Sequence, residues 1–424
     1  MRRSVGFAVA VALVVGLLAG CASTKATQGP AGSGKDKTEL VIGMTRSTTG
    51  DAAHSSEQGV QGIQIWQDEV NAQGGIFVKQ YNKKLPIKIV FYDDRSDKQQ
   101  VTKLYEKLIT EDKVDLLIGP FGSTLTTAAA VVTEKYQKPL IIWSAASDAL
   151  YSQGFRYIIS ASQIASSELS HPKIDQMKAL GYKKLALIYL DESYPASESD
   201  NAKKYAEAQG MEVVLYEKFA KGNQDYTSLL AKLADKKPDA VYVSAYEDQQ
   251  ANMVRQMREQ NLMFPYVFMT YSSEPNWLQL TGDDGMYIVG GTLADPSVKF
   301  EVTDGLTNEQ FWDKFAKKFN GVTPSLAASQ AYACGVMLEK YAATANTLSA
   351  TDIKQAALDL SGKVTLVTGN YVLDPSGKQL GMNSVLTQAV KDASGKQKLN
   401  IVWPEAVKTG DSTFPIPQWN QRKK

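Results

Sequence analysis

Short apolar runs of strand length alternate with amphipathic segments of helical length, beginning at Leu40. The first series of such runs and segments covers residues 40–44, 58–73, 87–92, 98–112, 116–118, 126–137 and 140–143. The runs at 115–118 and 140–143 are apolar on both faces, which is typical of strands that helices cover on either side. This alternation predicts a parallel sheet whose strands are joined by crossover helices.

A second series of the same kind predicts a second lobe. Its strands and helices are expected at residues 185–189, 200–209, 213–216, 226–234, 240–244, 249–260 and 266–270. A third block has helical patterns at 308–319, 326–344 and 350–360 and strand patterns at 369–373 and 385–389. These are too few to close a third sheet, so we expect the chain to cross back and complete the first two lobes. The sequence therefore predicts an α/β protein of two lobes.

The first residues have the pattern of an export signal. Two arginines precede an apolar run, 5–18, which is short for a membrane span. The run ends in Leu-Ala-Gly-Cys, which resembles the lipobox of bacterial lipoproteins, where the cysteine is acylated and becomes the first mature residue. We therefore expect a signal peptide at 1–20, lipidation of Cys21 that anchors the protein to a membrane, and a flexible tether at 21–38. The alternative is an ordinary signal peptide in which Cys21 is incidental.

Charge and cysteine content limit the partners. Of the 46 basic residues two precede Cys21, which leaves 44 against 45 acidic residues. Such a balance argues against nucleic acid and against a strongly basic membrane-binding surface. Cys334 is the second cysteine, and His54 and His171 are the two histidines. An internal disulfide is therefore excluded in the mature chain, a His/Cys metal site is nearly so, and no cofactor is expected.

Glycine-rich and acidic motifs follow the first predicted strands and helix. They are Ile42-Gly43, Thr49-Gly50, Gly59, the run Asp68-Glu69-Val70-Asn71-Ala72-Gln73-Gly74-Gly75-Ile76, Asp93-Asp94, and Ile118-Gly119-Pro120 with Ser123. From about residue 40 to 404 the chain resembles the type I periplasmic binding proteins, and most closely the branched-chain amino acid and amide binding branch of ABC importers. The resemblance implies two doubly wound parallel-sheet lobes joined by three crossovers, which close on a solute like a hinged clam. It also implies a monomer in the periplasm or at the cell surface, with a small solute and ABC permease subunits as partners.

The resemblance and the element pattern together divide the chain. Lobe 1 is expected at 39–160 with about 295–365, and lobe 2 at 161–294 with about 366–404. Residues 405–424 are expected to form a loose C-terminal tail.

Two neighbouring strand ends in lobe 1 are candidate contacts for a solute carboxylate. Ligands of open parallel sheets gather at the carboxyl ends of strands, where helix N-termini present free N–H groups. Ser123 lies at such a place, and the alternative is that it only caps the helix. The resemblance implies that Ser123 and Ser147 hold the carboxylate and that the carbonyl of Ala145 accepts from a solute amine. Ser147 as a simple helix cap remains an alternative.

Lobe 2 contributes two tyrosines and one acid. Tyr194 and Tyr246 follow strands and match family positions where a ring lies against the solute, although either could be an ordinary loop tyrosine. An acidic residue that meets a solute ammonium is expected after the strand at 266–270, but Glu274 comes about two residues late. Glu274 could still reach the amine, or Tyr271 and Ser272 could line a pocket for an acid without an amine, such as an aromatic or keto acid. His54 stands where the family often has an aromatic residue, so one wall of the pocket differs.

An enzyme and a signalling sensor are the competing classes. We expect no catalytic residues, because no Gly-x-Ser-x-Gly motif accompanies the histidines. His171-Pro172 is expected in a loop before a helix, Asp93-Asp94 in a turn, and Cys334 in the core. A lipid-anchored sensor that docks on a signalling receptor would have the same fold and the same sequence pattern.

Overall fold

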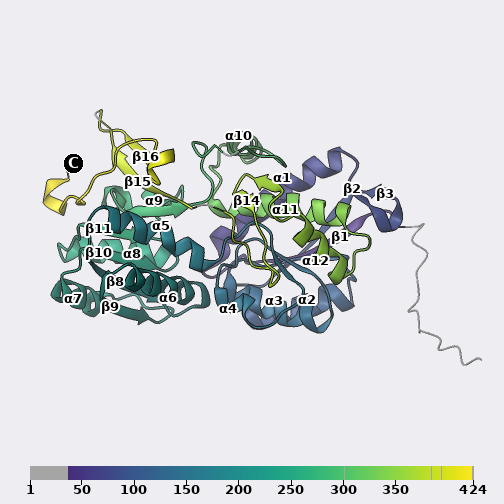
Figure 1. Ribbon diagram of the computed structural model, residues 1–424, viewed down its shortest axis with the longest axis horizontal. Helices are drawn as coiled ribbons and strands as arrows, with labels where there is room; N and C mark the ends of the chain where they lie inside the picture. The colour runs from purple at the N-terminus through teal and green to yellow at the C-terminus, as the bar shows by residue number, and fades with distance from the viewer. Residues whose placement is uncertain (1–36, 300, 383, 393, 423–424) are drawn as a thin grey trace, which may run out of the picture. The chain divides into compact units, whose positions relative to one another are not determined.

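The computed structural model describes residues 37–299, 301–382, 384–392 and 394–422. The expected signal peptide, Cys21 and nearly all of the expected tether lie outside these residues. Figure 1 shows two sheets, each flanked by helices, and the segments that connect them. We call the unit around the first sheet lobe 1 and the unit around the second sheet lobe 2.

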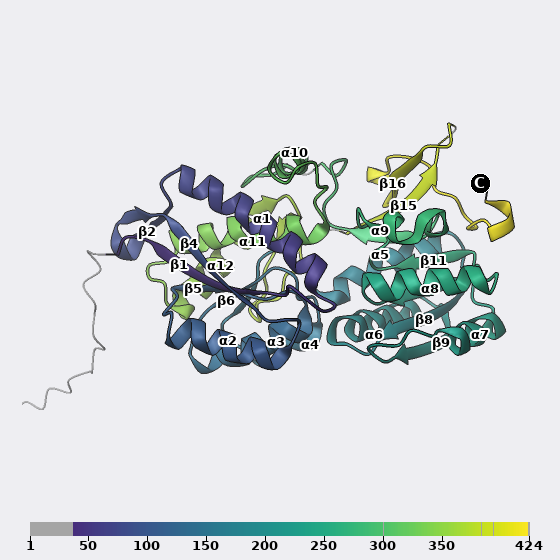
Figure 2. The ribbon, with the colours of Figure 1, turned by 180° about the vertical axis from the view of Figure 1, so that it is seen from behind.

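Lobe 1 is built on a five-stranded parallel sheet with the order β4-β1-β5-β6-β7. The strands are β1 (Leu40–Arg46), β4 (Ile87–Asp93), β5 (Leu116–Ile118), β6 (Leu140–Ile142) and β7 (Ile158–Ser160). The helices are α1 (Ala53–Ala72), α2 (Lys98–Thr110), α3 (Ser123–Lys135), α4 (Asp148–Tyr151), α10 (Asn308–Lys318), α11 (Leu326–Thr344) and α12 (Ala350–Asp359). Helices α1 and α11 lie on one face of the sheet and α2 and α3 on the other (Figure 2).

Lobe 2 has a seven-stranded sheet with the order β16-β15-β12-β11-β10-β8-β9. The strands are β8 (Lys184–Leu190), β9 (Glu212–Phe219), β10 (Ala240–Ser244), β11 (Tyr266–Met269), β12 (Val289–Thr292), β15 (Val385–Lys391) and β16 (Gln397–Trp403). The helices are α5 (Ser166–Ala179), α6 (Ser193–Ala208), α7 (Thr227–Lys236), α8 (Glu247–Glu259) and α9 (Trp277–Thr281). Strands β15 and β16 are antiparallel to their neighbours, so this sheet is parallel except at one edge.

Two small hairpins and four short 3-10 helices complete the described part. The hairpins pair β2 (Ile76–Val78) with β3 (Lys83–Leu85) and β13 (Val364–Leu366) with β14 (Gly369–Tyr371). The 3-10 helices are η1 (Lys79–Tyr81), η2 (Gly282–Gly285), η3 (Glu405–Val407) and η4 (Trp419–Gln421).

The chain passes between the lobes three times, as expected. It leaves lobe 1 after β7, returns after β12 to form α10, α11 and α12, and leaves again after β14 to form β15 and β16. The fold is thus the predicted one: two doubly wound α/β lobes joined by three crossovers.

Close packing of α1 against α11 fixes the position of the N-terminal turn of α11. A Cβ atom on Gly62 would lie 2.1 Å from the carbonyl oxygen of Ala328, and one on Gly335 would lie 2.3 Å from the ring of Trp66. Glycine is therefore needed at both crossing points. Cys334 is fully buried beside Gly335, in the core where it was expected.

Two local expectations are wrong. His171 and Pro172 lie inside helix α5 rather than in a loop before a helix. The residues after Pro404 are not loose over their described part, because Ile416 and Trp419 are buried against lobe 2. The indole N–H of Trp419 donates to the carbonyl of Leu262 at 2.8 Å.

The acidic pair after β4 makes a turn, as expected. Asp94 is buried, and its carboxylate accepts hydrogen bonds from the hydroxyls of Thr45 and Ser47, both at 2.6 Å. Asp93 accepts from the hydroxyl of Thr48 at 2.6 Å. These bonds fix the loop between β1 and α1, and this loop leads into the first turn of α1, where Ser55 lies.

Candidate functional site

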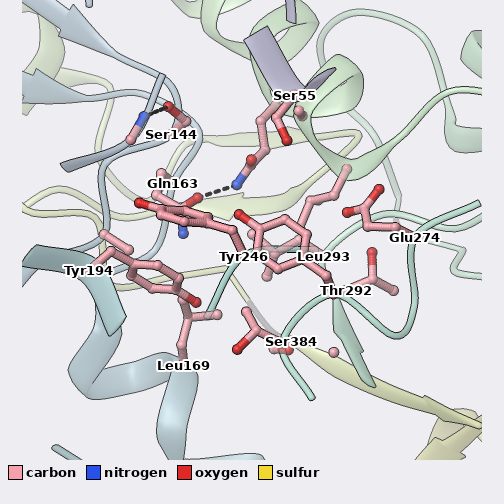
Figure 3. Close-up of a pocket in the computed structure, with 18 of the residues that line it drawn as sticks. Ser55, Ser144, Gln163, Leu169, Tyr194, Tyr246, Glu274, Thr292, Leu293 and Ser384 are labelled. Atoms are coloured by element: carbon pink, nitrogen blue, oxygen red, sulfur yellow. Dashed lines mark hydrogen bonds between the residues drawn. The ribbon is translucent and has the colours of Figure 1, made fainter. Parts of the chain in front are cut away.

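A cavity lies between the lobes, at the carboxyl ends of strands from both sheets. Its described lining residues are Ser55, Phe121, Gly122, Ser144, Ala146, Gln163, Leu169, Lys173, Tyr194, Tyr246, Phe268, Thr270, Tyr271, Glu274, Gly291, Thr292, Leu293, Leu326, Ala327, Gln330 and Ser384. Figure 3 shows residues of both lobes, with Ser144 and Ser55 on one side and Tyr194 and Ser384 on the other. About half of the lining residues are aromatic or aliphatic and most of the others are polar, a mixture typical of sites that take small organic solutes.

The three residues expected to hold the carboxylate lie directly behind the lobe 1 wall. Ser123, Ala145 and Ser147 have no exposed surface, whereas Ser144 and Ala146 line the cavity. The hydroxyl of Ser123 accepts a hydrogen bond from the backbone N–H of Ser147 at 3.0 Å, so the two strand ends are tied together. The carbonyl of Ala145 accepts from the hydroxyl of Tyr151 at 2.8 Å.

The hydroxyl of Ser147 differs from that of Ser123. It is buried and has no hydrogen-bond partner among the described residues. Buried hydroxyls are nearly always hydrogen-bonded, so an unsatisfied one beside a cavity indicates a place for a ligand or a water.

Both tyrosines expected in lobe 2 line the cavity. Tyr194 lies in the first turn of α6, and Tyr246 is the N-cap residue of α8. The ring of Tyr271 also lines the cavity, and its centroid is 6.1 Å from that of Tyr246. Burial raises the pKa of all three hydroxyls, so each stays protonated and is available as a hydrogen-bond donor.

Glu274 also reaches the cavity, in spite of its late position in the sequence. A turn after β11, closed by a bond from its N–H to the carbonyl of Tyr271 at 3.0 Å, brings it there. Its Oε2 is buried without a partner among the described residues. Burial, together with the nearby carboxyl of Glu247, raises the pKa of Glu274 to about 8. Ser272, in contrast, is buried behind the wall and donates to the carbonyl of Met269 at 3.1 Å.

Sequence reasoning missed a buried ion pair at the lobe 2 side of the cavity. The ammonium of Lys173, on α5, lies 2.7 Å from Oε1 of Glu198, on α6, and these side chains are 3% and 0% exposed. Oε2 of Glu198 accepts from the hydroxyls of Ser244 and Thr270. Lys173 follows the histidine-proline pair that breaks the helical pattern of α5, so no periodic signal pointed to it.

A glutamine pair was also missed, on the crossover side of the cavity. The amide of Gln330, on α11, donates to the side-chain oxygen of Gln163, which follows β7 (Figure 3). Gln163 in turn donates to the carbonyl of Ile164 at 2.8 Å. The pair joins a crossover segment to the helix that closes one end of the cavity.

Polar contacts join the lobes around the cavity. The hydroxyl of Thr124, on α3, donates to the carboxylate of Glu192 at 2.7 Å. The ammonium of Lys221 lies 3.0 Å from the carboxylate of Asp51 and 3.5 Å from that of Glu192. Thr124 and Asp51 belong to lobe 1 and Glu192 and Lys221 to lobe 2, so the Thr124–Glu192 and Asp51–Lys221 contacts exist only when the lobes are together.

The described residues do not provide the parts of a metal centre or a membrane span. Within them, no group of three or more His, Cys, Asp and Glu side chains could hold a metal ion. No helix in the same part of the chain is long and apolar enough to cross a bilayer.

Known proteins with similar sequences or structures are solute-binding proteins. An amino acid binding protein of Pseudomonas aeruginosa is 27% identical over 231 residues, which cover 53% of this chain and 58% of that protein. The chain thus matches little more than half the length of that curated relative. The branched-chain amino acid transporter substrate-binding protein LivJ of Streptococcus pneumoniae, solved with isoleucine, superposes with a TM-score of 0.71 at 23% identity, covering 87% of this chain and 100% of that one.

A solute-binding protein of an ABC transporter from R. palustris, solved with benzoate, has a TM-score of 0.70 at 21% identity. The match covers 85% of this chain and 95% of that one. At these identities the two structures support the fold alone. The family model described as "Periplasmic binding protein" matches residues 39–396, which include the lobe 1 sheet, the lobe 2 sheet except its edge strand β16, and every described residue that lines the cavity. The chain therefore belongs to the periplasmic binding protein family.

Proposed function

We propose that the protein is a lipid-anchored, extracytoplasmic solute-binding protein of an ABC importer. It captures a small carboxylate-bearing solute, an amino acid, an amide or an aromatic or keto acid, between its lobes and delivers it to the permease subunits. The observation that carries this proposal is the aromatic cavity between the lobes: Glu274 in its wall has a buried carboxyl oxygen without a partner among the described residues, and the hydroxyl of Ser147, directly behind the wall, is likewise without one. The named solutes of the structural neighbours, isoleucine and benzoate, fall in the same two classes.

In this proposal the carboxylate lies at the strand ends of lobe 1, and the rings of Tyr194 and Tyr246 cover the solute from lobe 2. The N-terminal turn of α3, which begins at Ser123 behind Gly122, offers backbone N–H groups to a negative charge. Residues 39–160 with about 295–365 then act as one jaw, and 161–294 with about 366–404 as the other.

A thermal-shift screen of amino acids, their amides and aromatic acids tests the binding function. A solute that binds only the folded protein adds about 2.7 kcal/mol of stability at a hundred times its dissociation constant. We expect at least one carboxylate-bearing solute to raise the melting temperature. A screen in which none does so would contradict the proposal.

Anchoring is tested separately in cells. Replacement of Cys21 by serine should release the protein from the membrane fraction or leave it unprocessed, because the acyl chains would have no thiol to join. The prediction of a lipid anchor would be contradicted if the mature wild-type protein began at a residue other than Cys21 and carried no lipid. That result would leave the proposed binding function unaffected.

A further inference from the structure

Among the described residues that line the cavity, Lys173 is the only base and Glu274 is the only acid. A carboxylate-bearing solute therefore meets one cationic side chain in this cavity, and that side chain belongs to lobe 2 rather than to the serine-bearing wall of lobe 1. Lys173 stands on α5, directly after the crossover from β7.

Among the described residues, the ammonium of Lys173 has one hydrogen-bond acceptor, the carboxylate of Glu198. An ammonium has three N–H donors, and the hydrogen bond that Lys173 makes goes to Glu198. The ammonium also lies 4.9 Å from the centroid of the Phe268 ring, which itself lines the cavity. The neighbouring strand β12 presents Gly291 to the stem of the lysine, where an added Cβ would lie 3.5 Å from Cε.

Glu198 can share Lys173 with a solute. Its other oxygen accepts from Ser244 and from Thr270, at 3.2 Å in the second case, so the carboxylate stays hydrogen-bonded when Lys173 turns one N–H toward the cavity. The buried charge of Lys173 is compensated by Glu198 in the empty protein, which removes the penalty that an unpaired buried lysine would carry.

We infer that Lys173 is a specificity-determining residue, whose ammonium binds an anionic group of the solute, a carboxylate, from the lobe 2 side of the cavity. This inference rests on the proposed function and narrows it: acids bind and their uncharged amides do not. It also gives lobe 2 a charged contact with the solute, in addition to its tyrosine rings.

The test compares acids with their isosteric amides by isothermal titration calorimetry at pH 7. The probes are benzoate with benzamide, phenylacetate with phenylacetamide, and L-isoleucine with L-isoleucinamide, together with any acid found in the thermal-shift screen and its amide. We expect the wild type to bind at least one acid tenfold or more tightly than its amide. A hydrogen bond to a charged group predicts a loss of about ten- to a hundredfold for that acid when the ammonium is removed.

Three variants separate binding from folding. Lys173→Met alone leaves the buried carboxylate of Glu198 without its cation, so the double variant Lys173→Met/Glu198→Gln removes both charges together. It should lose the preference for the acid while its affinity for the amide changes less than threefold. Lys173→Arg should keep the preference, because the positive charge remains.

The matched control is Lys354→Met. Lys354 is also a buried lysine, and it donates to the carbonyl of Ile158 at 2.7 Å in lobe 1, away from the cavity. This variant should keep the acid preference of the wild type.

Failure of the inference about Lys173 and failure of the proposed function give different results. If acids bind and the double variant retains their advantage over amides, or if the wild type shows no such advantage, Lys173 is a structural partner of Glu198 only and the inference is overturned. If no solute in the thermal-shift screen binds the wild type, the inference and the proposed function fall together.

Discussion

Glu274 is a carboxyl group placed where its charge is disfavoured in the empty protein. Burial and the neighbouring Glu247 raise the pKa of Glu274 to about 8, and the backbone N–H of Leu326 only partly opposes this. The folded empty protein therefore holds a proton that the unfolded chain, with an ordinary glutamate pKa, releases above about pH 4.5. The stability that the protonated carboxyl of Glu274 contributes is fully present below about pH 4.5 and is lost as the pH rises through about 8.

Glu274→Gln should consequently stabilise the empty protein at high pH only. We expect its free energy of unfolding in urea to exceed that of the wild type by roughly 2–4 kcal/mol at pH 8, and by about 1 kcal/mol or less at pH 5. The exposed Glu259 serves as a control, and Glu259→Gln should show no such pH dependence. An equal effect of Glu274→Gln at both pH values would contradict the prediction.

The pH dependence of binding should distinguish a solute that carries an amine from one that does not. A solute with an ammonium group pairs with ionised Glu274, so its affinity should rise as the pH increases toward 8. An acid without an amine accepts a hydrogen bond from protonated Glu274, so its affinity should fall as the pH passes through about 8. Calorimetric titration from pH 6 to 9 distinguishes the two cases, and a flat profile that Glu274→Gln leaves unchanged would show that Glu274 does not contact the solute.

The two serines behind the lobe 1 wall should respond differently to truncation. Ser123→Ala leaves the buried N–H of Ser147 without its acceptor, which costs about 1–3 kcal/mol of stability. Ser147→Ala removes a hydroxyl that has no partner among the described residues, so the stability of the empty protein should change by less than about 1 kcal/mol.

Affinity separates the serines again. If the hydroxyl of Ser147 meets the solute, Ser147→Ala should weaken binding by about tenfold or more, since a hydrogen bond to a charged group is lost. Chemical denaturation and calorimetry on the same samples measure both effects. Equal losses of stability for the two alanine variants would show that the hydroxyls play the same structural part.

The site was predictable from sequence to the extent that strand ends fix positions. Tyr194 and Tyr246 follow strands directly, so the parallel sheet carries them to the cavity. The depth of Ser123 and Ser147 below the wall depends on which way each loop turns after its strand. Lys173 depends on how a helix after a crossover packs on a sheet formed later in the chain, and no local pattern encodes that.

At the scale of elements, unbroken apolar segments were predictable and irregular ones were not. Helix α11 and strand β10 have the predicted bounds, because each is a largely apolar, buried run that polar or turn-forming residues do not interrupt. The start of helix α5 was placed too late, after Pro172 rather than at Ser166, because Pro172 lies inside the helix and proline ordinarily interrupts one. Strand β12 is Val-Gly-Gly-Thr, whose two glycines carry little strand signal, so only its place between β11 and β15 defines it.

Helix α4 begins with a residue that joins both lobes and a crossover. The carboxylate of Asp148 accepts from the hydroxyl of Ser166 at 2.8 Å, from the amide of Asn201 at 2.7 Å and from the ammonium of Lys378 at 3.1 Å. Burial alone would raise the pKa of Asp148, but the bonds from Ser166, Ser167 and Lys378 hold it below the ordinary value. The stability that this group contributes is present above its unfolded pKa and is lost as the pH falls through its folded pKa.

Asp148→Ala should therefore destabilise the protein by about 1–3 kcal/mol at pH 7, because several donors lose a charged acceptor at once. The loss should shrink as the pH falls toward the folded pKa of Asp148, which lies below the ordinary value, because the stability that the wild-type carboxylate contributes is then lost as well. Thermal unfolding across pH 3–7 measures this. A loss that stays constant over the range would mean that the charge of Asp148 is irrelevant.

The polar contacts that join Thr124 of α3 and Asp51 of the β1–α1 loop to lobe 2 should affect the affinity for the solute more than the stability of the fold. Exposed ion pairs contribute only about 0.2–1 kcal/mol, so Lys221→Ala should change the melting temperature little. Its partner Asp51 belongs to the other lobe, so this ion pair stabilises the closed form. Its loss should therefore weaken solute binding by up to about fivefold. Lys232→Ala is the control, since Lys232 pairs with Glu217 inside lobe 2, and equal effects of both substitutions on affinity would contradict a role in closure.

On the scale of the whole molecule, solute contacts divided between two lobes imply closure on binding. Tyr246 of lobe 2 approaches lobe 1 closely: its hydroxyl lies 3.8 Å from where a Cβ on Gly122 would be. A solute that touches both lobes favours the closed form, and only that difference in affinity shifts the equilibrium.

Small-angle scattering with and without a saturating solute should therefore show a smaller radius of gyration in the bound state. Tyr194→Ala/Tyr246→Ala should weaken binding and compaction together, because lobe 2 loses its share of the contacts. A wild-type radius that does not change on binding would mean that the site is preformed or belongs to one lobe.

The order in which the chain is laid down also has a kinetic consequence. The side chain of Gln58 in α1 accepts a hydrogen bond from the backbone of Ser325, 267 residues later, and β15 and β16 reach lobe 2 only at the end of the chain. Because the chain emerges N-terminus first, neither lobe can complete its fold until the C-terminal segments are available. Contacts between residues so far apart in the sequence form slowly. The apolar side of helix α1 stays uncovered until α11, in the last third of the chain, has emerged. A polypeptide built in this way resists premature folding, the property that a protein needs if it is threaded through a membrane as an extended chain and assembled on the far side.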